Sequence, residues 1–259
     1  MCIIRQDQPT IGGRKLHYLL KQEFSKGELP GRDALFDLLR ENGLLVRRRK
    51  RKVPITTNSW HHFHKYPNLY KGKIPDGPNK VWVADITYIR MENGEFLYLS
   101  LLTDVYSHKI VGWYLSESLD TKGPLMALEQ ALVNLPDNHQ LIHHSDRGVQ
   151  YCSYAYTDLL KSRKIGISMT QSGDPRENAI AERVNGILKS EWIDREQICS
   201  LEQAQERIDS IVVVYNSKRP HMSINMLTPD QAHKQEGTLK RKWKTYYKKT
   251  ENVLFSTQS

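Results

Sequence analysis

The chain has 259 residues, of which 39% are hydrophobic and 26% charged, a composition typical of a globular protein and unlike that of collagen or a disordered chain. It contains no apolar run of about 18 residues, and residues 1–15 include no hydrophobic stretch of signal-peptide length. We therefore expect a cytoplasmic protein without a membrane partner. The three cysteines, Cys2, Cys152 and Cys199, are odd in number and far apart, which argues against a disulfide framework.

The formal charge of +9 is unevenly distributed along the chain. Residues 1–54 carry 13 Lys and Arg against 6 Asp and Glu, and residues 233–259 carry 7 against 2, whereas residues 55–232 carry 18 against 21. Basic ends around a slightly acidic centre fit a protein whose ends hold a polyanion, but such ends can equally be solvated tails. The charge distribution suggests nucleic acid as a partner without deciding the question.

Two short helices separated by a turn are predicted near the N-terminus. Residues 15–24 and 32–41 carry apolar side chains at helical spacing, and Gly and Pro between them break the first helix. Six consecutive basic residues follow, which can neutralise phosphates without reading bases: Arg47, Arg48, Arg49, Lys50, Arg51 and Lys52. We expect residues 1–52 to form a helix-turn-helix-like DNA-binding module. A plain helical hairpin with a basic linker is the alternative.

The rest of the chain is predicted to consist of a linker, an α/β domain and a tail. Residues 53–78 contain Pro and Gly without periodicity, which is typical of a linker, and residues 233–259 form a basic C-terminal tail. Within residues 79–232, tight connections predict an antiparallel meander of three strands, followed by alternating helices and strands. The expected strands are 81–90, 96–105, 109–116, 140–144 and 165–170, and the expected helices are 121–135, 154–163, 177–192 and 201–216.

Two aspartates of the α/β domain stand out by their position. Asp85 is the one charge in an apolar strand, where a buried carboxylate is costly unless it is paired, protonated or bound to a metal. Asp146 follows the fourth strand where the chain leaves the sheet, a usual place for ligands in α/β proteins. Taken alone, either residue could be a hydrogen-bonded buried Asp or part of a turn. Asp104, at the end of the second strand and beside a turn, is expected to be structural.

Glu182 belongs to a polar stripe on the predicted helix 177–192. At 100° per residue, Asn178, Asn185 and Lys189 fall on the side of Glu182, while Glu191 falls on the opposite side among apolar residues. Such a stripe is usually solvated surface. A carboxylate, two amides and a lysine are also suited to bind a metal ion and a phosphate.

The three carboxylates and the motifs around them resemble a known family. There are 60 residues between Asp85 and Asp146 and 35 between Asp146 and Glu182, a spacing similar to that of the DDE triad of the retroviral integrase superfamily. The surrounding motifs are WVADIT at 82–87, IVGW at 110–113, HSDRGVQ at 144–150, NAIAERVNGILK at 178–189, YNSKRPH at 215–221 and TP at 228–229. Over residues 12–232 the chain resembles the transposase encoded by the second reading frame of bacterial insertion sequences of the "insertion sequence three" type. Glu177 departs from the Asp that many relatives have before the Asn-Ala pair.

The resemblance implies an RNase H-like integrase catalytic core, an α/β fold with a mixed five-stranded sheet in the order βββαβαβα. It implies a DDE transposase in which Asp85, Asp146 and Glu182 are catalytic and hold two Mg²⁺ or Mn²⁺ ions. Water would first cleave a phosphodiester at the element end, and the freed 3′-OH would then attack another phosphodiester, so that DNA cleavage is followed by strand transfer.

The resemblance also implies DNA contacts and partners. Lys189 would hold phosphate near the cut, Asn178 would orient DNA or the helix, and Arg219 and His221 would contact the DNA backbone. The partners implied are the DNA of the element ends and target and further copies of the chain on that DNA. A third is the first-frame product, because the end-binding domain of that frame is expected to be missing here. Such a protein would be associated with the bacterial nucleoid.

Two other functions compete with this interpretation. An RNase H-fold nuclease that cleaves without strand transfer would share the three carboxylates but would not need the N-terminal helices and the basic run. A non-catalytic DNA-binding protein derived from a transposase would have no reason to keep an acidic trio at this spacing.

Overall fold

The computed structural model describes residues 1–25, 27–46, 61–137, 139–171 and 175–242. The basic run 47–52 and the tail beyond residue 242 lie outside the described residues. The helices are α1 (Cys2–Asp7), α2 (Gly13–Glu23), α3 (Arg32–Glu41), α4 (Lys122–Leu132), α5 (Val149–Cys152), α6 (Tyr154–Ser162), α7 (Ala179–Glu191), α8 (Leu201–Ser217) and α9 (Pro229–Ala232). The strands are β1 (Val81–Arg90), β2 (Phe96–Asp104), β3 (Ile110–Ser116), β4 (Ile142–Ser145) and β5 (Gly166–Met169), and short 3₁₀ turns occur at η1 (Pro175–Asn178), η2 (Ile193–Arg195) and η3 (Met222–Ile224).

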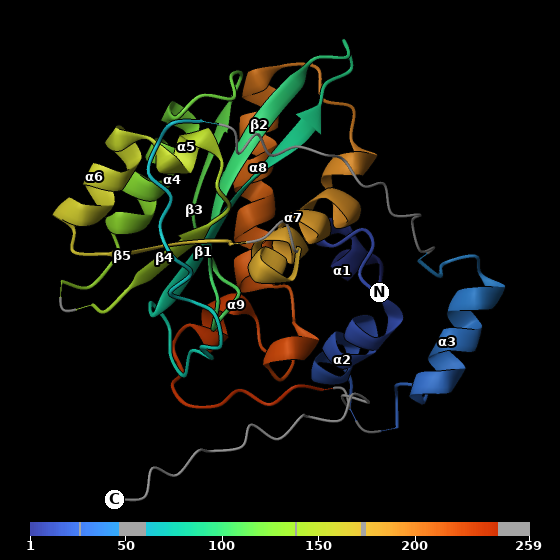
Figure 1. The fold of residues 1–259 in the computed structure, drawn as a ribbon. Helices are drawn as coiled ribbons and strands as arrows, with labels where there is room; N and C mark the ends of the chain where they lie inside the picture. Colours follow the sequence, from blue (N-terminus) through green and yellow to red (C-terminus); the bar gives the residue numbers. More distant parts are fainter. Residues whose placement is uncertain (26, 47–60, 138, 172–174, 243–259) are drawn as a thin grey trace, which may run out of the picture.

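A mixed five-stranded sheet in the order β3-β2-β1-β4-β5 forms the centre of the α/β domain (Figure 1). The first three strands make the predicted antiparallel meander, while β4 pairs with β1 and β5 with β4 in parallel. The RNase H-like arrangement expected from the resemblance is confirmed. The parallel pairing of β1 and β4 runs as far as Val83 opposite His144, and Asp85 and Asp146 each follow two residues later, close enough for the Asp146 charge to act on Asp85.

Helices cover both faces of this sheet. One hydrophobic core lies between the sheet and the pair α7 and α8, and a second lies between the sheet and α4 and α6. The glycine of the IVGW motif is required for the second layer, because a Cβ at Gly112 would lie 2.1 Å from the Ala127 carbonyl oxygen of α4. Each sheet face is thus buried, which explains why both alternating faces of β1 are largely apolar.

The N-terminal helices have a small core of their own. α2 and α3 pack together through Leu16, Leu20, Leu35 and Leu39, which lie at the predicted helical spacing. In Figure 1, α1 and α2 lie on the side of α7 and α8, and α3 lies further out. The helical module is therefore attached to the α/β domain through α1, α2 and the segment between them.

Residues 61–78, predicted as part of a linker, make ordered contacts with the α/β domain. Phe63 and Tyr66 pack against the core under α4 and α6, and the Leu69 amide donates a hydrogen bond to the Ser168 hydroxyl of β5 at 2.8 Å. These aromatic side chains supply apolar area that the domain buries, which a search for periodicity does not detect.

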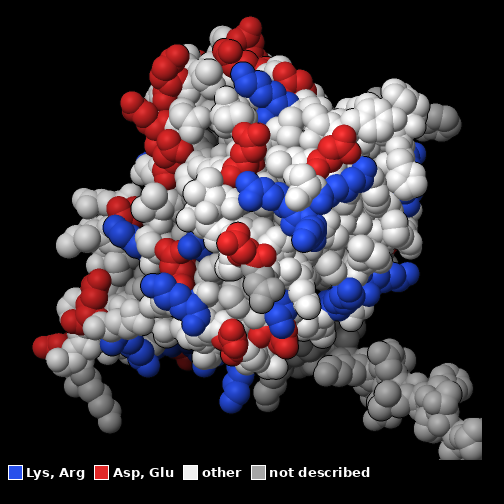
Figure 2. Space-filling view, turned by 90° about the vertical axis from the view of Figure 1, so that its left-hand side faces the viewer, with Lys and Arg blue, Asp and Glu red and all other residues white. Residues whose placement is uncertain are grey.

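The described surface carries charges of both signs. Figure 2 shows the face that lies at the left of Figure 1, around α6, where Lys and Arg side chains are interspersed with Asp and Glu. Among the described helices, none has both the length and the apolar character needed to cross a bilayer.

Candidate active site

The site begins where β1 and β4 run side by side. Asp85 is half-buried in the middle of β1, where its Oδ1 accepts the Ile86 amide at 3.0 Å. Asp146 comes directly after β4, where its Oδ1 accepts the Gly148 amide at 2.9 Å. The two carboxylates are therefore presented by neighbouring parallel strands and oriented by backbone donors.

Gly148 allows the Asp146 carboxylate to take this position. A Cβ on Gly148 would lie 3.0 Å from Asp146 Oδ1 and 3.2 Å from Gln150 Oε1, closer than side chains normally approach. The glycine of the Asp-Arg-Gly sequence thus has a steric role beside the candidate site, in addition to the turn that its sequence predicts.

α7 brings the third carboxylate. Asn185 of α7 is buried and donates from Nδ2 to Asp85 Oδ2 at 2.7 Å. Glu182 lies three residues earlier, on the same face of the helix, and is exposed. The polar stripe predicted for this helix therefore includes one buried residue that contacts Asp85, Asn185, beside the solvent-exposed Glu182.

The charges of the three carboxylates act on one another. The pKa of Asp85 is raised from 3.8 to about 7, chiefly by burial and next by the Asp146 charge, with a smaller contribution from Glu182, while the Asn185 and Ile86 hydrogen bonds act in the opposite direction. The same negative charge helps to raise the pKa of Tyr88, on the same strand, although burial is the larger cause there. Negative charge from Asp146 and Glu182 thus acts on Asp85 at this edge of the sheet.

This donor set is suited to a hard divalent cation. Within the described part of the chain, no three His, Cys, Asp or Glu side chains come close enough together to hold a metal ion, so Asp85, Asp146 and Glu182 are not gathered around one point in this structure. Carboxylate oxygens are nevertheless the ligands that Mg²⁺ and Mn²⁺ prefer, and a cation would relieve the repulsion that raises the Asp85 pKa. The buried Oδ1 atom of Asn185 accepts no hydrogen bond within the described chain and adds a further oxygen beside Asp85.

Asn178 and the strand-end histidines support the site from behind. Asn178 is buried and donates from Nδ2 to the Ala84 carbonyl at 3.0 Å, so it ties the start of α7 to β1; this matches the expected orientation of the helix and not a DNA contact. His143 and His144 are buried and hydrogen-bonded to Tyr156 and Ser168, respectively, each at 2.8 Å. Burial lowers the pKa of both histidines, which is consistent with neutral hydrogen-bonding roles.

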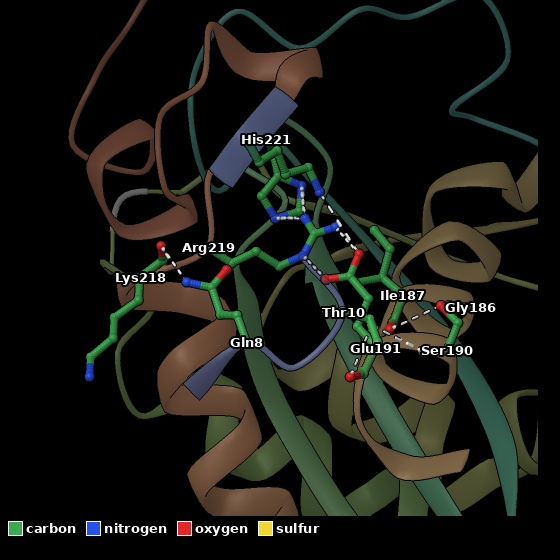
Figure 3. Close-up of polar contacts among 10 residues, drawn as sticks. Gln8, Thr10, Gly186, Ile187, Ser190, Glu191, Lys218, Arg219 and His221 are labelled. Atoms are coloured by element: carbon green, nitrogen blue, oxygen red, sulfur yellow. Dashed lines mark hydrogen bonds and ion pairs between the residues drawn. The ribbon is translucent and has the colours of Figure 1, made fainter. Parts of the chain in front are cut away.

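Arg219 and His221 do not lie where a DNA contact requires. Arg219 is 1% exposed and forms a bidentate ion pair with Glu191 at 2.6 and 2.7 Å, and its Nη1 lies 2.9 Å from Nε2 of the buried His221 (Figure 3). In place of the expected DNA backbone contacts, these two residues have a structural role, because a guanidinium that is almost completely buried and paired with Glu191 cannot reach a phosphate. Lys189, in contrast, is half-buried near the end of α7 and is two helical turns from Glu182.

Asp104 has the structural role that its place beside a turn predicts. Its side chain is fully buried, Oδ2 accepts the Asn79 amide at 2.8 Å, and Oδ1 accepts the amide and hydroxyl of Ser107 at 2.8 and 2.7 Å. A carboxylate with this many donors anchors a turn and has little remaining capacity for a metal.

Comparison with known proteins agrees with this geometry. Residues 75–175 and 163–229 match two family models, each described as an integrase core domain. The chain is 36% identical over 222 residues to the 31 kDa protein of insertion element IS600 from Shigella sonnei, covering 85% of this chain and 80% of that protein. It is 32% identical over 195 residues to the transposase InsF for insertion sequence IS3A from Escherichia coli K12, covering 74% and 67%.

Among solved structures, the fold is similar to the catalytic core domain of HTLV-2 integrase in complex with magnesium. The TM-score is 0.50 at 20% identity, and the match covers 62% of this chain and 99% of that domain. At this identity the similarity concerns the fold.

Proposed function

The chain belongs to the insertion-sequence transposases that carry an integrase core domain, and from this we propose that Asp85, Asp146 and Glu182 are the catalytic carboxylates of a DDE transposase. Enzymes of this family cleave DNA strands and transfer them to new sites. The observation that supports the assignment most is the position of Asp85 beside Asp146, with Glu182 on the helix face that contacts Asp85 through Asn185.

The three carboxylates would hold the divalent metal that integrase-like enzymes use. Mg²⁺ or Mn²⁺ is the fitting choice because the donors are hard oxygens, and the HTLV-2 core was solved with magnesium. When two such ions are bound, they stabilise the attacking and the leaving oxygen of a phosphodiester displacement. We propose two ions because each displacement would have both an attacking and a leaving oxygen to stabilise.

The residues of the chain itself then hold and orient the reacting groups. The Gly148 amide and the Asn185 side chain fix the carboxylates of Asp146 and Asp85, and so fix where a scissile phosphate can lie. Lys189 would bind a phosphate of the DNA strand two turns along α7 from Glu182. The basic run 47–52, outside the described residues, would add non-specific contacts to the DNA backbone.

The partners of this reaction are DNA and further copies of the chain. The HTLV-2 core was solved in a trimeric form, which supports assembly of more than one copy on the element ends. We also propose that the first-frame product of the same element supplies end recognition.

The test is a gel assay with labelled duplexes that carry the flanking element ends, in Mg²⁺ or Mn²⁺. Wild type is expected to nick and join DNA, and Glu182→Gln to lose both activities by on the order of 1,000-fold while DNA binding is kept. Glu206→Gln, the same change at an exposed position of α8, is the matched control and should stay active.

Cleavage without joined products would contradict strand transfer. Metal-independent cleavage, or equal activity of Glu182→Gln and Glu206→Gln, would contradict the proposed site. If wild type binds DNA without chemistry, the assay is repeated with the first-frame product, and continued inactivity would overturn the proposed function.

A further inference from the structure

The segment after α1 reaches the end of the helix that carries Glu182. Figure 3 shows Thr10 beside the last residues of α7, where its Oγ1 lies 3.5 and 3.3 Å from the carbonyl oxygens of Ser190 and Glu191. Trp192, directly after α7, donates from Nε1 to the Asp7 carbonyl at 2.7 Å. The last carbonyls of a helix have no partner inside the helix, so a segment about 180 residues away in sequence supplies the missing cap.

A buried ion pair holds the same end of α7. Both oxygens of the Glu191 carboxylate accept hydrogen bonds from Arg219, which follows α8. Lys15 of α2 places its Nζ 3.8 Å from Oε1 of Glu191. Gln8 adds a hydrogen bond from Nε2 to the Lys218 carbonyl at 3.3 Å, and Asp7 pairs with the Lys218 ammonium at 2.6 Å. A bidentate pair fixes orientation as well as distance, so these contacts define how α7 is rotated.

The rotation of α7 matters because the candidate site depends on it. Glu182 lies nine residues before Glu191, roughly 13 Å along the same rigid helix. Val184 and Leu188 pack α7 on the sheet, but apolar packing has little directionality and tolerates small rotations. The hydrogen bonds of Asn178 and Asn185 to β1 give direction at the site itself, and the polar contacts at the C-terminal end give it at the far end of the helix.

We propose that residues 7–15 are a positioning element of the active site, which holds α7 in the rotation at which Glu182 and Asn185 face Asp85. This inference rests on the proposed function, because it acts through Glu182. It makes the N-terminal module part of the catalytic unit, so that DNA held by the module and the carboxylates that cut it are joined by one rigid connection.

The test uses two substitutions of the same buried residue. Thr10→Val keeps the shape of the side chain and removes the hydroxyl, and Thr10→Ser restores the hydroxyl. Cleavage is measured in the full chain at saturating DNA while Mn²⁺ is titrated. For Thr10→Val we expect a maximal rate lower by about fivefold and an activation midpoint at about fivefold higher Mn²⁺, and for Thr10→Ser values within about twofold of wild type.

Thr157→Val is the matched control. Thr157 is 2% exposed in α6, on the other face of the sheet, and donates its hydroxyl to the Ser153 carbonyl at 3.0 Å. The Thr157→Val variant should lower the melting temperature about as much as Thr10→Val does and leave the midpoint of Mn²⁺ activation unchanged. Trp192→Phe, which removes the donor to Asp7, is the second variant and should move the midpoint in the same direction as Thr10→Val.

If Thr10→Val and Trp192→Phe lower stability like Thr157→Val and leave the midpoint unchanged, the segment is merely structural and the inference is overturned. This result is distinct from failure of the proposed function. In that case wild type itself would show no metal-dependent cleavage, or Glu182→Gln would retain it.

Discussion

Asp85 contacts α7 through Asn185, and Glu191 is the last residue of α7. The charges around the two carboxylates differ in sign. Asp85 faces Asp146 and Glu182, and burial together with these charges raises its pKa to about 7. Glu191 is also largely withdrawn from water, which by itself raises a pKa, but hydrogen bonds and charge from Arg219 outweigh burial and hold its pKa below the usual range. Burial, and after it the Arg219 charge, lower the pKa of the neighbouring Lys15 to about 7.

The difference separates a carboxylate that is paired within the chain from the one proposed to bind a metal ion. Glu191 has its counter-ions within the chain, since both of its carboxylate oxygens accept from Arg219 and Lys15 lies close by. At Asp85, burial and the like charges of Asp146 and Glu182 raise the pKa, so the folded protein tolerates repulsion there. A site that maintains such repulsion is suited to a cation from solution, whereas a site that neutralises it is not.

The largest effect is expected from breaking the ion pair of Glu191 and Arg219. Glu191→Gln leaves the Arg219 charge buried without a counter-ion and should lower the free energy of unfolding by about 3–5 kcal/mol, measured by urea denaturation. Because the folded-state pKa of Glu191 is below its unfolded value, its contribution is present above pH 4.5 and is lost as the pH falls through the folded pKa. The variant should therefore lose less stability than wild type on acidification.

Glu196→Gln is the control for burial. Glu196 also accepts a bonded guanidinium, that of Arg207, but both side chains are more exposed, at 27% and 37%. This variant should lose no more than about 1 kcal/mol. Equal losses from the two Glu→Gln changes would show that the burial of the Glu191 pair is not what matters.

A smaller effect of opposite sign is expected at Asp85. Without metal, the raised folded pKa makes the native state bind more protons than the unfolded state between about pH 4 and 7, so the Asp85 contribution to stability falls as the pH rises through this window. Asp85→Asn should abolish that decline and raise the melting temperature at pH 8 in EDTA by about 2–4 °C. Mn²⁺ should stabilise wild type at pH 8 and have little effect on the variant.

Asp104→Asn is the comparison for this variant. Its carboxylate is satisfied by three hydrogen bonds, so the amide should destabilise the fold at pH 8 instead of stabilising it. If Asp85→Asn also destabilises the metal-free protein, the repulsion at the sheet edge is smaller than the site geometry indicates.

Local patterns predicted the elements well where periodicity is strong. β1 (Val81–Arg90) and α3 (Arg32–Glu41) have the predicted bounds, because apolar spacing is a property of neighbouring residues. The helices α1, α5 and α9 were missed because pieces of four to six residues carry almost no period. α9 had one readable signal, the capping box of Thr228 and Gln231 with Pro229 at the first position.

The candidate site shows the limit of local reasoning. The spacing of the three carboxylates indicated the site, but the burial of Arg219 depends on Glu191, 28 residues earlier, and no local pattern connects them. A signal was present in the sequence, since Glu191 is a charge on the apolar side of its helix and such a charge needs a buried partner. The DNA contact expected of Arg219 was inferred from the motif at 215–221, which does not include the partner Glu191.

The smallest effect is expected from Asn185, which links α7 to Asp85. Asn185→Ala removes the donor to Asp85 and should cost about 1 kcal/mol of stability and lower the cleavage rate at saturating Mn²⁺ by about fivefold. Asn185→Asp keeps the shape but adds a like charge, so it should raise the Asp85 pKa and impair cleavage more than Asn185→Ala does.

Asn216→Ala separates loss of stability from loss of position. Asn216 is equally buried, but its amide exchanges two hydrogen bonds with the Ile110 backbone, at 3.0 and 2.9 Å, on β3. It should cost at least as much stability as Asn185→Ala and leave the cleavage rate of the folded protein unchanged. A rate loss shared by both variants would mean that the Asn185 hydrogen bond stabilises the fold without positioning Asp85, and the contrast between the two ends of α7 would then be one of charge alone.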